Sequence, residues 1–541
     1  MPGGPAPRGV VALSPFAPSE LDLFVPLDEL AGGGDSPARL LRLAERTLGR
    51  TPGSLGALRV LRRSLDARKN RPLGYRLRCL VGEEGAALDF TTEGEARPVV
   101  RWPAGRRIPR VVIVGSGPAG TWAALRLAEA GIAATILERG KQVQPRRADL
   151  AALTRGHLDP RSNYCFGEGG AGTFSDGKLY TRAKDRQAVA SVLRDLVRFG
   201  APGEIAVESR PHVGSNRLPK VLTALRQHLE GEGVAYRFDA DVSGIRFDRA
   251  GVRAVQLTEG GEVEADAVIL AVGHSARSIY DWAARAGIAL ERKAIAVGVR
   301  IEHPQSLIDE IQYGSAAGHP ALPPALYELT SSGAGRGVYS FCMCPGGWIV
   351  PAATEPDGVV VNGMSLSKRD SRFANAGMVV AVDVADFGPA GDGPLAGVAF
   401  QRRIEQAAAR VGGGGFRAPG QRLGDFLSDR ASAAVAESSY RPGVVPGALA
   451  EVFPPFVVTA LREGLRRMGT QMPRFLHPQA SLIAAETRTS APVRFLRDSE
   501  SLMSPGCPGL YPVGEGAGYA GGIVSAALDG LRAADRLIAT G

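Results

Sequence analysis

An apolar run that breaks into glycines constrains this chain more than any other feature. Residues 110–120 read Arg-Val-Val-Ile-Val-Gly-Ser-Gly-Pro-Ala-Gly, and helix-forming residues follow. Val111 to Val114 have the pattern of a short strand that is buried on both faces. Pro118 suits the first turn of a helix, where its missing N–H costs nothing. The stretch therefore predicts a strand, a tight turn and a helix.

The glycine spacing has a local physical reason. Gly115 can adopt the dihedrals of the turn, Gly117 lets a phosphate approach the main chain, and Gly120 lets the helix pack close to the strand. The helix N-terminus favours an anion. A second predicted strand, residues 133–137, ends at Glu138, a position where a carboxylate accepts hydrogen bonds from a ribose diol. We predict an adenine dinucleotide site that includes Pro118 and Ala119; the alternative is a glycine turn in an ordinary parallel sheet.

Two further glycine-rich segments support a larger cofactor. Residues 162–178 hold five glycines, at 167, 169, 170, 172 and 177, which fit a backbone lying against something flat or phosphorylated better than a flexible surface loop. Residues 267–273 form a buried-strand pattern that ends in Gly273. Residues 509–529 predict a strand, a glycine-rich turn and a helix whose N-terminus stabilises a reduced flavin. We expect contacts to a cofactor from Gly169, Gly170, Gly172, Gly273, Gly514, Glu515, Gly521, Gly522 and Ile523, which favours FAD over NAD alone.

Length and composition bound the protein class. A chain of 541 residues is too long for one core, and 44% hydrophobic with 22% charged residues is ordinary for a globular protein. Because no long uncharged apolar stretch and no leader pattern occur, we expect a cytoplasmic protein without membrane contact. The five cysteines are scattered, which suits a reducing compartment.

The net charge of +9 is partly concentrated between Arg59 and Arg78. This arginine-rich stretch is either a binding patch for an anionic substrate, a nicotinamide cofactor or RNA, or a solvated face. We favour the solvated face, because no aromatic recognition motif accompanies the charge. Nucleic acid is therefore an improbable partner.

The sequence predicts an α/β protein whose chain divides into four ranges. After an irregular tail of about twenty residues, a helix over residues 37–48 and strands over residues 57–64 and 75–80 predict a small α+β domain, ferredoxin-like in its order of elements. Residues 142–161 are polar, and we predict that this segment crosses the surface of the protein. A helix over 218–229 precedes an alternating strand meander over 234–264. We expect an N-terminal domain (1–105), an FAD-binding domain in two parts (106–290 and 488–541), and an inserted α+β substrate domain (291–487).

Several long motifs resemble the large bacterial family of uncharacterised FAD-dependent dehydrogenases, within the broader glutathione-reductase-like flavoproteins. They are residues 64–69, 115–120, 138–140, 166–178, 298–305, 339–347, 486–490 and 514–523. The resemblance covers nearly the whole chain and implies FAD and a Rossmann-like FAD-binding domain of glutathione-reductase type. It adds Arg139 and Thr173 to the expected FAD contacts, and it supplies no substrate.

Candidate catalytic residues lie outside the glycine motifs. Cys342 and Cys344 alternate along a strand, so both thiols face one way, toward the flavin or into the core, and their spacing strains a disulfide. A zinc site lacks further ligands. His303 follows a strand, on a loop near the site or as a structural histidine. Further candidates are Arg300, Glu302 and His274. Glu486 and Arg488 share a strand face, as an ion pair or as an anchor for a substrate carboxylate.

These features predict an FAD-dependent oxidoreductase that transfers a hydride between bound flavin and a small organic substrate. No second glycine motif marks a full nicotinamide domain, so NAD(P)H binds transiently or the substrate itself supplies the electrons. The alternatives are a single-component flavin monooxygenase using NAD(P)H and oxygen, and a non-catalytic flavoprotein that binds RNA or a protein partner. The sequence leaves the oligomeric state open.

Overall fold

The computed structural model describes residues 18–30, 36–83, 97–389 and 392–540. Contacts divide the chain into two compact units, residues 1–95 with 206–209, and residues 96–205 with 210–541. The predicted irregular tail of about twenty residues lies outside the described residues as far as residue 17, and the first strand begins at Ser19.

The first unit is a three-stranded antiparallel sheet with two helices. Its strand order is β1-β3-β2, so β3 lies between two strands that run parallel to each other. This is the split β-α-β arrangement of ferredoxin-like folds, followed by one hairpin strand. The elements are β1 (Ser19–Pro26), α1 (Leu27–Leu30), α2 (Pro37–Leu48), β2 (Ala57–Asp66) and β3 (Gly74–Gly82).

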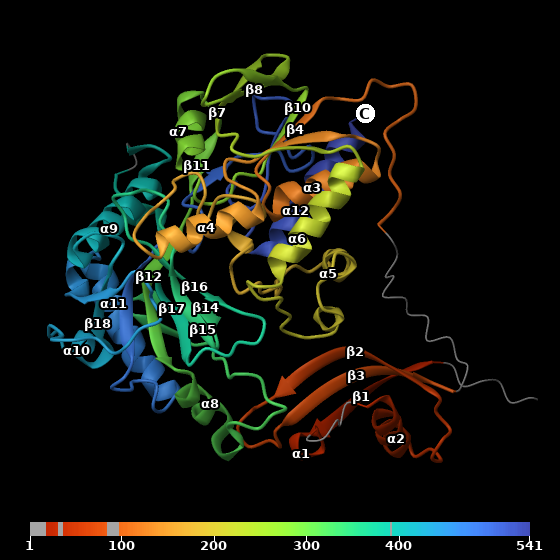
Figure 1. Ribbon diagram of the computed structural model, residues 1–541, viewed down its shortest axis with the longest axis vertical. Coiled ribbons are helices and arrows are strands. Elements are labelled where there is room, and N and C mark those ends of the chain that lie inside the picture. Colours follow the sequence, from red (N-terminus) through yellow and green to blue (C-terminus); the bar gives the residue numbers. More distant parts are fainter. Residues whose placement is uncertain (1–17, 31–35, 84–96, 390–391, 541) are drawn as a thin grey trace, which may run out of the picture. The chain divides into compact units, whose positions relative to one another are not determined.

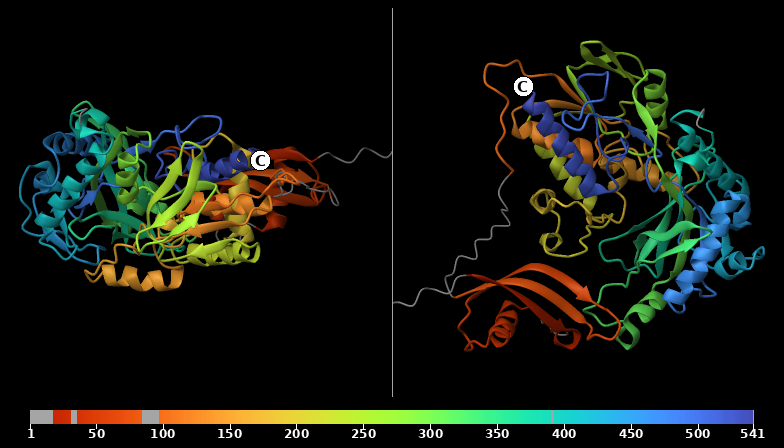
Figure 2. Two further views of the ribbon diagram at one scale, coloured as in Figure 1. Left: turned by 90° about the horizontal axis from the view of Figure 1, so that it is seen from above. Right: turned by 180° about the vertical axis from the view of Figure 1, so that it is seen from behind.

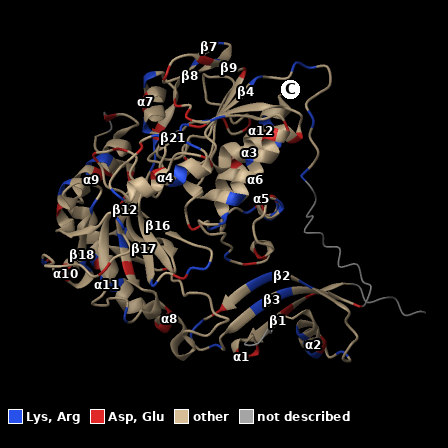
Figure 3. Cartoon of the chain, viewed as in Figure 1, with Lys and Arg blue, Asp and Glu red and all other residues tan. Residues whose placement is uncertain are grey.

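The arginine-rich stretch follows β2 and β3, where Figure 3 shows basic positions along both strands. Asp66 is buried, and its carboxylate accepts from Arg68 at 2.6 Å and from Arg76 at 2.7 Å. These hydrogen bonds, Arg68 first, hold the pKa of Asp66 well below its ordinary value. Arg78 pairs with Asp22 at 3.2 Å. Part of the positive charge therefore serves the unit's own ion pairs.

The second unit contains a five-stranded parallel sheet (Figure 1). Its strand order is β22-β10-β4-β5-β6. The chain runs outward from β4 through β5 to β6, and β10 and β22 are then added on the other side of β4, as in dinucleotide-binding folds. The strands are β4 (Val111–Val114), β5 (Ala134–Leu137), β6 (Ala235–Arg237), β10 (Ala267–Leu270) and β22 (Leu510–Pro512). Val111 to Val114 are all buried, as the sequence predicted.

The two faces of this sheet are covered differently. Val111 and Ile113 pack with one group of helices, which Figures 1 and 2 show side by side, whereas Val112 and Val114 pack against the strand meander and α7. The helices are α3 (Pro118–Glu129), α5 (Arg186–Arg198), α6 (Leu218–Gly231) and α12 (Ile523–Ala539), and the opposite layer is β7 (Val242–Asp248), β8 (Gly251–Leu257), β9 (Glu262–Glu264) and α7 (Arg277–Arg285). Because successive side chains of a strand point to opposite faces of the sheet, each strand contributes to the packing of both layers.

One prediction for this region is wrong, and another lacked a helix. The first strand predicted for the meander belongs to the parallel sheet as β6, because it pairs with β5 and not with β7. The predicted polar surface crossing contains helix α4 (Val143–Leu153). The polar residue Arg146 is buried there by hydrogen bonds that local sequence does not reveal.

A second, seven-stranded sheet has the order β13-β14-β17-β12-β20-β18-β19 and is antiparallel except for the β18–β19 pair. Its core is shared with α9, α10 and α11. The elements are β12 (Ile295–Pro304), β13 (Thr330–Gly333), β14 (Arg336–Cys344), β17 (Phe373–Val382), α9 (Ala396–Gly412), β18 (Ala418–Arg422), α10 (Leu423–Leu427), β19 (Val444–Pro446), α11 (Pro455–Gln471) and β20 (Ser481–Glu486).

The remaining elements are short. They are β11 (Leu290–Arg292), which pairs with β21 (Val493–Phe495), the hairpin β15 (Gly347–Pro351) and β16 (Val361–Ser365), and helix α8 (Gln305–Tyr313). Across the ranges that the structure describes, we find no helix with the length and apolar character needed to cross a bilayer.

Candidate functional site

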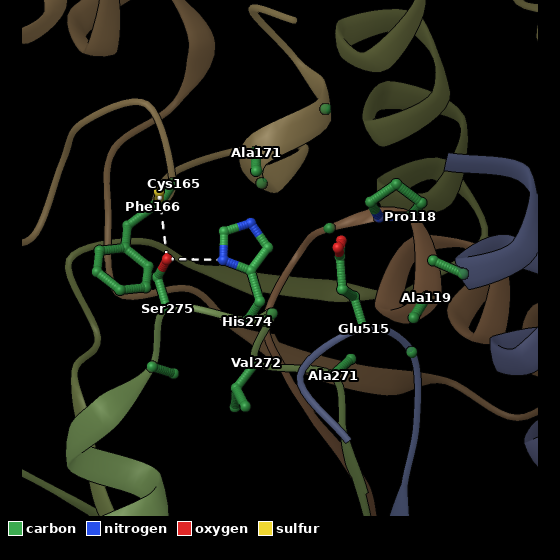
Figure 4. Close-up of a pocket in the computed structure, with 18 of the residues that line it drawn as sticks. Pro118, Ala119, Cys165, Phe166, Ala171, Ala271, Val272, His274, Ser275 and Glu515 are labelled. Carbon is green, nitrogen blue, oxygen red and sulfur yellow. Dashed lines mark hydrogen bonds between the residues drawn. The ribbon is translucent and has the colours of Figure 1, made fainter. Parts of the chain in front are cut away.

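A cavity of about 440 Å³ opens beside the carboxyl ends of the parallel strands. Val114, Leu137, Ala271 and Val513, which end or follow four of these strands, line it. In open α/β sheets, ligands bind at this edge, where the strand order reverses. Figure 4 shows side chains from several segments of the chain projecting into it. We call it the first cavity.

The three glycines of the first turn have different surroundings. A Cβ on Gly115 would overlap the carbonyl oxygen of Ala271, and one on Gly120 would overlap that of Gly115 and lie 3.0 Å from Ile113. At Gly117, by contrast, the nearest atom to a new Cβ is the Cα of Gly170 at 3.9 Å. Gly115 and Gly120 are therefore required by the protein itself, whereas Gly117 leaves space that belongs to the cavity.

Two helices begin at this cavity. Gly117 precedes α3, and Gly522 precedes α12, whose first residue is Ile523. At Gly521 and Gly522 a Cβ would meet nothing within 4 Å. Helix N-termini present unpaired N–H groups and a positive dipole, so the cavity suits an anionic ligand with phosphate groups. The open glycine backbone and both helix ends fit the pyrophosphate and the flavin of FAD.

Glu138 holds the glycine segments together. Its carboxylate accepts hydrogen bonds from the N–H groups of Ser116, Gly140 and Gly167, each at 2.9 Å, and from the Ser116 hydroxyl at 2.7 Å. A carboxylate has about four lone-pair positions. A ribose hydroxyl that bonds to Glu138 would therefore share these lone-pair positions with the four protein donors.

Arg146 organises the glycine-rich loop of residues 162–178, and sequence reasoning missed it. Its guanidinium is fully buried and donates to the carbonyl oxygens of Asn163 at 2.9 Å, Glu168 at 2.7 Å and Gly170 at 2.8 Å. Burial lowers the pKa of Arg146 to about 10, so it stays charged at neutral pH. In the sequence, Arg146 is one of several arginines in a polar segment, so nothing distinguishes it from its neighbours.

Cys342 and Cys344 both lie beside a lysine. The ammonium of Lys178 is 3.7 Å from the sulfur of Cys342 and 3.5 Å from that of Cys344. A bulge interrupts β14 after Phe341, and Cys342 has a left-handed φ of 45°. Cys342 lines the first cavity, whereas Cys344 is buried behind it.

This arrangement favours a thiolate on Cys342. The neighbouring Cys344 thiol, through a hydrogen bond, and the positive charges of Lys178 and Arg300 lower the pKa of Cys342 well below the ordinary thiol value, against the effect of burial. Burial also opposes the charge on Lys178, but the two sulfurs and Asp176 outweigh it and raise the pKa of Lys178. A thiolate is the reactive form of cysteine.

The predicted pair of Glu486 and Arg488 does not form, because β20 ends at Glu486 and the two side chains point to different partners. Glu486 pairs with the fully buried Arg300 at 2.6 Å, and Arg300 also donates to the Cys342 carbonyl oxygen at 3.0 Å. Arg488 pairs with Glu405 at 3.1 Å and lines the first cavity. Arg300 therefore supports the backbone of Cys342 from behind.

The two candidate histidines lie in different places. His303 is buried within β12 with its Nε2 2.9 Å from the Phe475 carbonyl oxygen, which agrees with the structural alternative and not with a loop near the site. His274 lines the first cavity, with Nδ1 2.8 Å from the Ser275 hydroxyl (Figure 4). Burial, with help from Arg488, lowers the pKa of His274 to about 4, so the ring is neutral at pH 7.

Glu515 is the acidic group of the first cavity that lacks a hydrogen-bond partner within the described ranges. Figure 4 shows its carboxylate projecting into the cavity beside the ring of His274. Burial raises the pKa of Glu515 to about 7, and Lys293 opposes the shift. The other acidic candidate, Glu302, is buried on β12 and accepts from the Ser439 N–H at 3.1 Å, outside the lining of the first cavity.

A second cavity, of about 1350 Å³, adjoins the first. The two share the lining residues Lys178, Tyr180, Phe341, Cys342 and Gly521. We call this shared region the junction. It brings a cysteine, a lysine and the turn before α12 to one place, although they are far apart in the sequence.

Most of the predicted cofactor residues meet at the first cavity. Its lining includes Gly115, Gly117, Pro118, Ala119, Glu138, Arg139, Gly170, Gly172, Gly273, Gly514, Glu515, Gly521, Gly522 and Ile523. Gly120, Gly169 and Thr173 lie behind it, where they pack against or bond to neighbouring segments. Cys344 and His303 also lie outside the lining. In the part of the chain that the structure describes, no three His, Cys, Asp or Glu residues gather as metal ligands.

Comparisons with known proteins agree with this geometry. Residues 109–157 match the model of an FAD binding domain, residues 188–305 that of the pyridine nucleotide-disulphide oxidoreductases, and residues 294–489 that of an FAD-dependent protein, C-terminal domain-like. An uncharacterized protein of Clostridium beijerinckii is 41% identical over 499 residues, which cover 90% of this chain and 92% of that protein. The chain belongs to this family of FAD-dependent oxidoreductases. FAD is its cofactor.

Solved structures that resemble the chain are distant. Glycine oxidase from Geobacillus kaustophilus is 15% identical with a TM-score of 0.34, over 80% of this chain and 95% of that one. The flavin-dependent brominase Bmp2 is 13% identical with a TM-score of 0.36, over 80% of each chain.

Proposed function

We propose that this enzyme transfers a hydride between bound FAD and a small organic substrate at the junction of the two cavities. The observation that carries the proposal is the shared lining, which gives one cavity for the cofactor and an adjoining one for a substrate, with Cys342 and Gly521 in both. When bound, FAD accepts or donates the hydride.

The chain's own residues bind and orient the reactants. The N–H groups at the start of α3 bind the pyrophosphate, and the start of α12 stabilises negative charge on the flavin side. Lys178 keeps Cys342 charged, so that the thiolate can take a proton from a substrate at the junction, and the thiol so formed returns it in the reverse reaction. Cys344 acts through its neighbour, as a positioning residue. Phe341 and Tyr180 give the junction an aromatic wall.

We infer that residues 106–290 and 488–541 form an FAD-binding domain of glutathione-reductase type, and that residues 291–487 form the substrate domain. Support comes from the sheets: the five parallel strands fall in the first two ranges, and the seven-stranded sheet falls in the third. The meander between the third and fourth parallel strands also fits this type. The electrons then come either from NAD(P)H that binds transiently or from the substrate itself.

The visible spectrum of the purified protein under anaerobic conditions, before and after NADH or NADPH, tests the proposal. Protein without flavin that FAD does not reconstitute would refute it. Flavin bands that bleach make NAD(P)H the donor, and substrate-dependent oxygen insertion would then replace our proposal with a monooxygenase. Bands that persist make the substrate the donor. We expect Cys342→Ser to retain FAD and to lose about 100-fold or more in the rate of the flavin-coupled step.

A further inference from the structure

We propose that the second cavity binds the substrate as an organic carboxylate, with Lys293 as the cation that holds it. The inference rests on the proposed function, since it assigns the second cavity to the substrate. It adds a chemical class of substrate to that function. The evidence is the unequal charge of the cavity wall.

Basic side chains outnumber acidic ones around the second cavity. The basic residues are Lys178, Arg182, Lys184, Arg210, Lys293, Arg369 and Arg532, and the acidic ones are Asp185, Glu328 and Asp529. A ligand of opposite charge is attracted to such a wall, and an anion gains most where the wall is least hydrated.

Each acidic residue of the wall already has a partner. Glu328 pairs with Arg210 at 3.3 Å, Asp529 with Arg497 at 2.7 Å, and Asp185 accepts from the N–H of Ala188 at 2.9 Å as the cap of α5. Arginines thus neutralise Glu328 and Asp529, and among the acidic lining residues Asp185 alone, whose charge a backbone N–H does not cancel, opposes the remaining positive charge.

Four basic residues of the wall have no ion pair with any residue of the described ranges. They are Arg182, Lys184, Lys293 and Arg532. Arg182, Lys184 and Arg532 are exposed, whereas Lys293 is half-buried between β11 and β12. Burial, and then the charge of Arg494, lower the pKa of Lys293. An anion beside Lys293 would restore the stabilisation that burial removes from its charged form.

The position of Lys293 links the wall to the junction. It interacts with Glu515 of the first cavity and lines the second. Aromatic side chains accompany it: Phe341 and Tyr180 at the junction, where Tyr180 is 63% exposed, and Tyr519 in the turn before α12. A substrate with a carboxylate on Lys293 would place a flat or apolar body against these rings, next to Cys342.

The exposed basic residues of the wall then act while the substrate approaches the cavity. Ser525, Asp529 and Arg532 lie on one face of α12, three or four residues apart, and this face lines the second cavity. Together with Arg182 and Lys184, Arg532 gives the wall a positive field that draws anions inward and weakens as salt is added.

Calorimetric titration of the FAD-loaded protein with benzoate and with its neutral analogue benzamide tests the proposal. We expect benzoate to bind at least about tenfold more tightly, with affinity that falls as salt is added. Lys293→Met should weaken benzoate binding about tenfold, Lys293→Arg should retain it, and Lys220→Met, an exposed lysine of α6 outside both cavities, should leave it unchanged.

Three results would overturn the inference. They are equal binding of benzoate and benzamide, benzoate binding that Lys293→Met leaves intact, and binding of NADPH at Lys293 with none of benzoate, succinate or acetate. The last result would assign the wall to the electron donor. FAD content is measured first by absorbance. Failure to bind FAD refutes the proposed function, whereas the same titration on FAD-free protein still decides the anion site.

Discussion

Replacement of Gly117 by valine should remove FAD binding while leaving the fold intact. The free protein has room for the new side chain, because the nearest atom to a Cβ at Gly117 is 3.9 Å away and its φ of −69° suits any residue. We therefore expect the free energy of unfolding of the FAD-free protein to change by no more than about 0.5 kcal/mol.

The loss of affinity follows from the space that the side chain takes. A valine at Gly117 would occupy the position of the pyrophosphate and keep it from the N–H groups of α3. Charge-assisted hydrogen bonds contribute about 1.5–3 kcal/mol each, so losing two costs about 3–6 kcal/mol. Since 1.4 kcal/mol is about a factor of ten, FAD affinity should fall about 100-fold to 10,000-fold.

Gly120→Ala is the matched control. There a Cβ would overlap the carbonyl oxygen of Gly115, so overpacking should destabilise the fold by about 1–3 kcal/mol or more. Chemical denaturation of the FAD-free variants and titration with FAD, followed by the visible flavin band, separate the two effects. Gly117→Val that retains its flavin, or that unfolds like Gly120→Ala, would refute the assignment of the first cavity.

Three further results follow from the site. Arg146→Met should lower the free energy of unfolding by at least about 3 kcal/mol, because buried carbonyl groups of the glycine-rich loop lose their donor; an unchanged denaturation midpoint would contradict this role. Alkylation of Cys342 by iodoacetamide, resolved by peptide mass, should persist below the ordinary thiol pKa of about 8.5, and Lys178→Met should shift its midpoint to higher pH. Glu515 has a folded pKa of about 7, above its unfolded value, so the native FAD-free protein binds more protons and should lose up to about 3 kcal/mol of stability as pH rises from about 4.5 to about 7. Denaturation of Glu515→Gln should show a smaller loss over the same range, and an equal loss would exclude this carboxyl.

The sequence predicted those helices and strands that depend on neighbouring residues in the chain. The strand before Gly115, the helix after it and helix α2 follow from apolar spacing, proline at a first helical turn and glycine, and the structure has them at nearly the predicted residues. β1 was missed, although Leu21, Leu23 and Val25 alternate along it, because no element was assigned between the predicted tail and the helix that begins at residue 37.

The site was predicted less completely, because it depends on distant partners. The glycines that line the first cavity could be found by their motifs. The pairing of Arg300 with Glu486, and of Arg488 with Glu405, joins residues far apart in the chain, and no spacing reports it. The bulge that turns Cys342 toward the cavity is likewise set by the pairing of β14 with β17.

The order of the parallel sheet has a consequence for how the protein is made. Four of its five strands come from residues 111–270, but β22 and α12 come from residues 510–539, after the whole seven-stranded sheet. A chain still attached to the ribosome therefore exposes the edge of β10 and an unfinished cofactor cavity until residues 510–539 emerge. Because such non-local pairing is slow, flavin can stabilise the fold only after β22 and α12 have been made, so the supply of FAD should decide how much of the new protein escapes proteolysis.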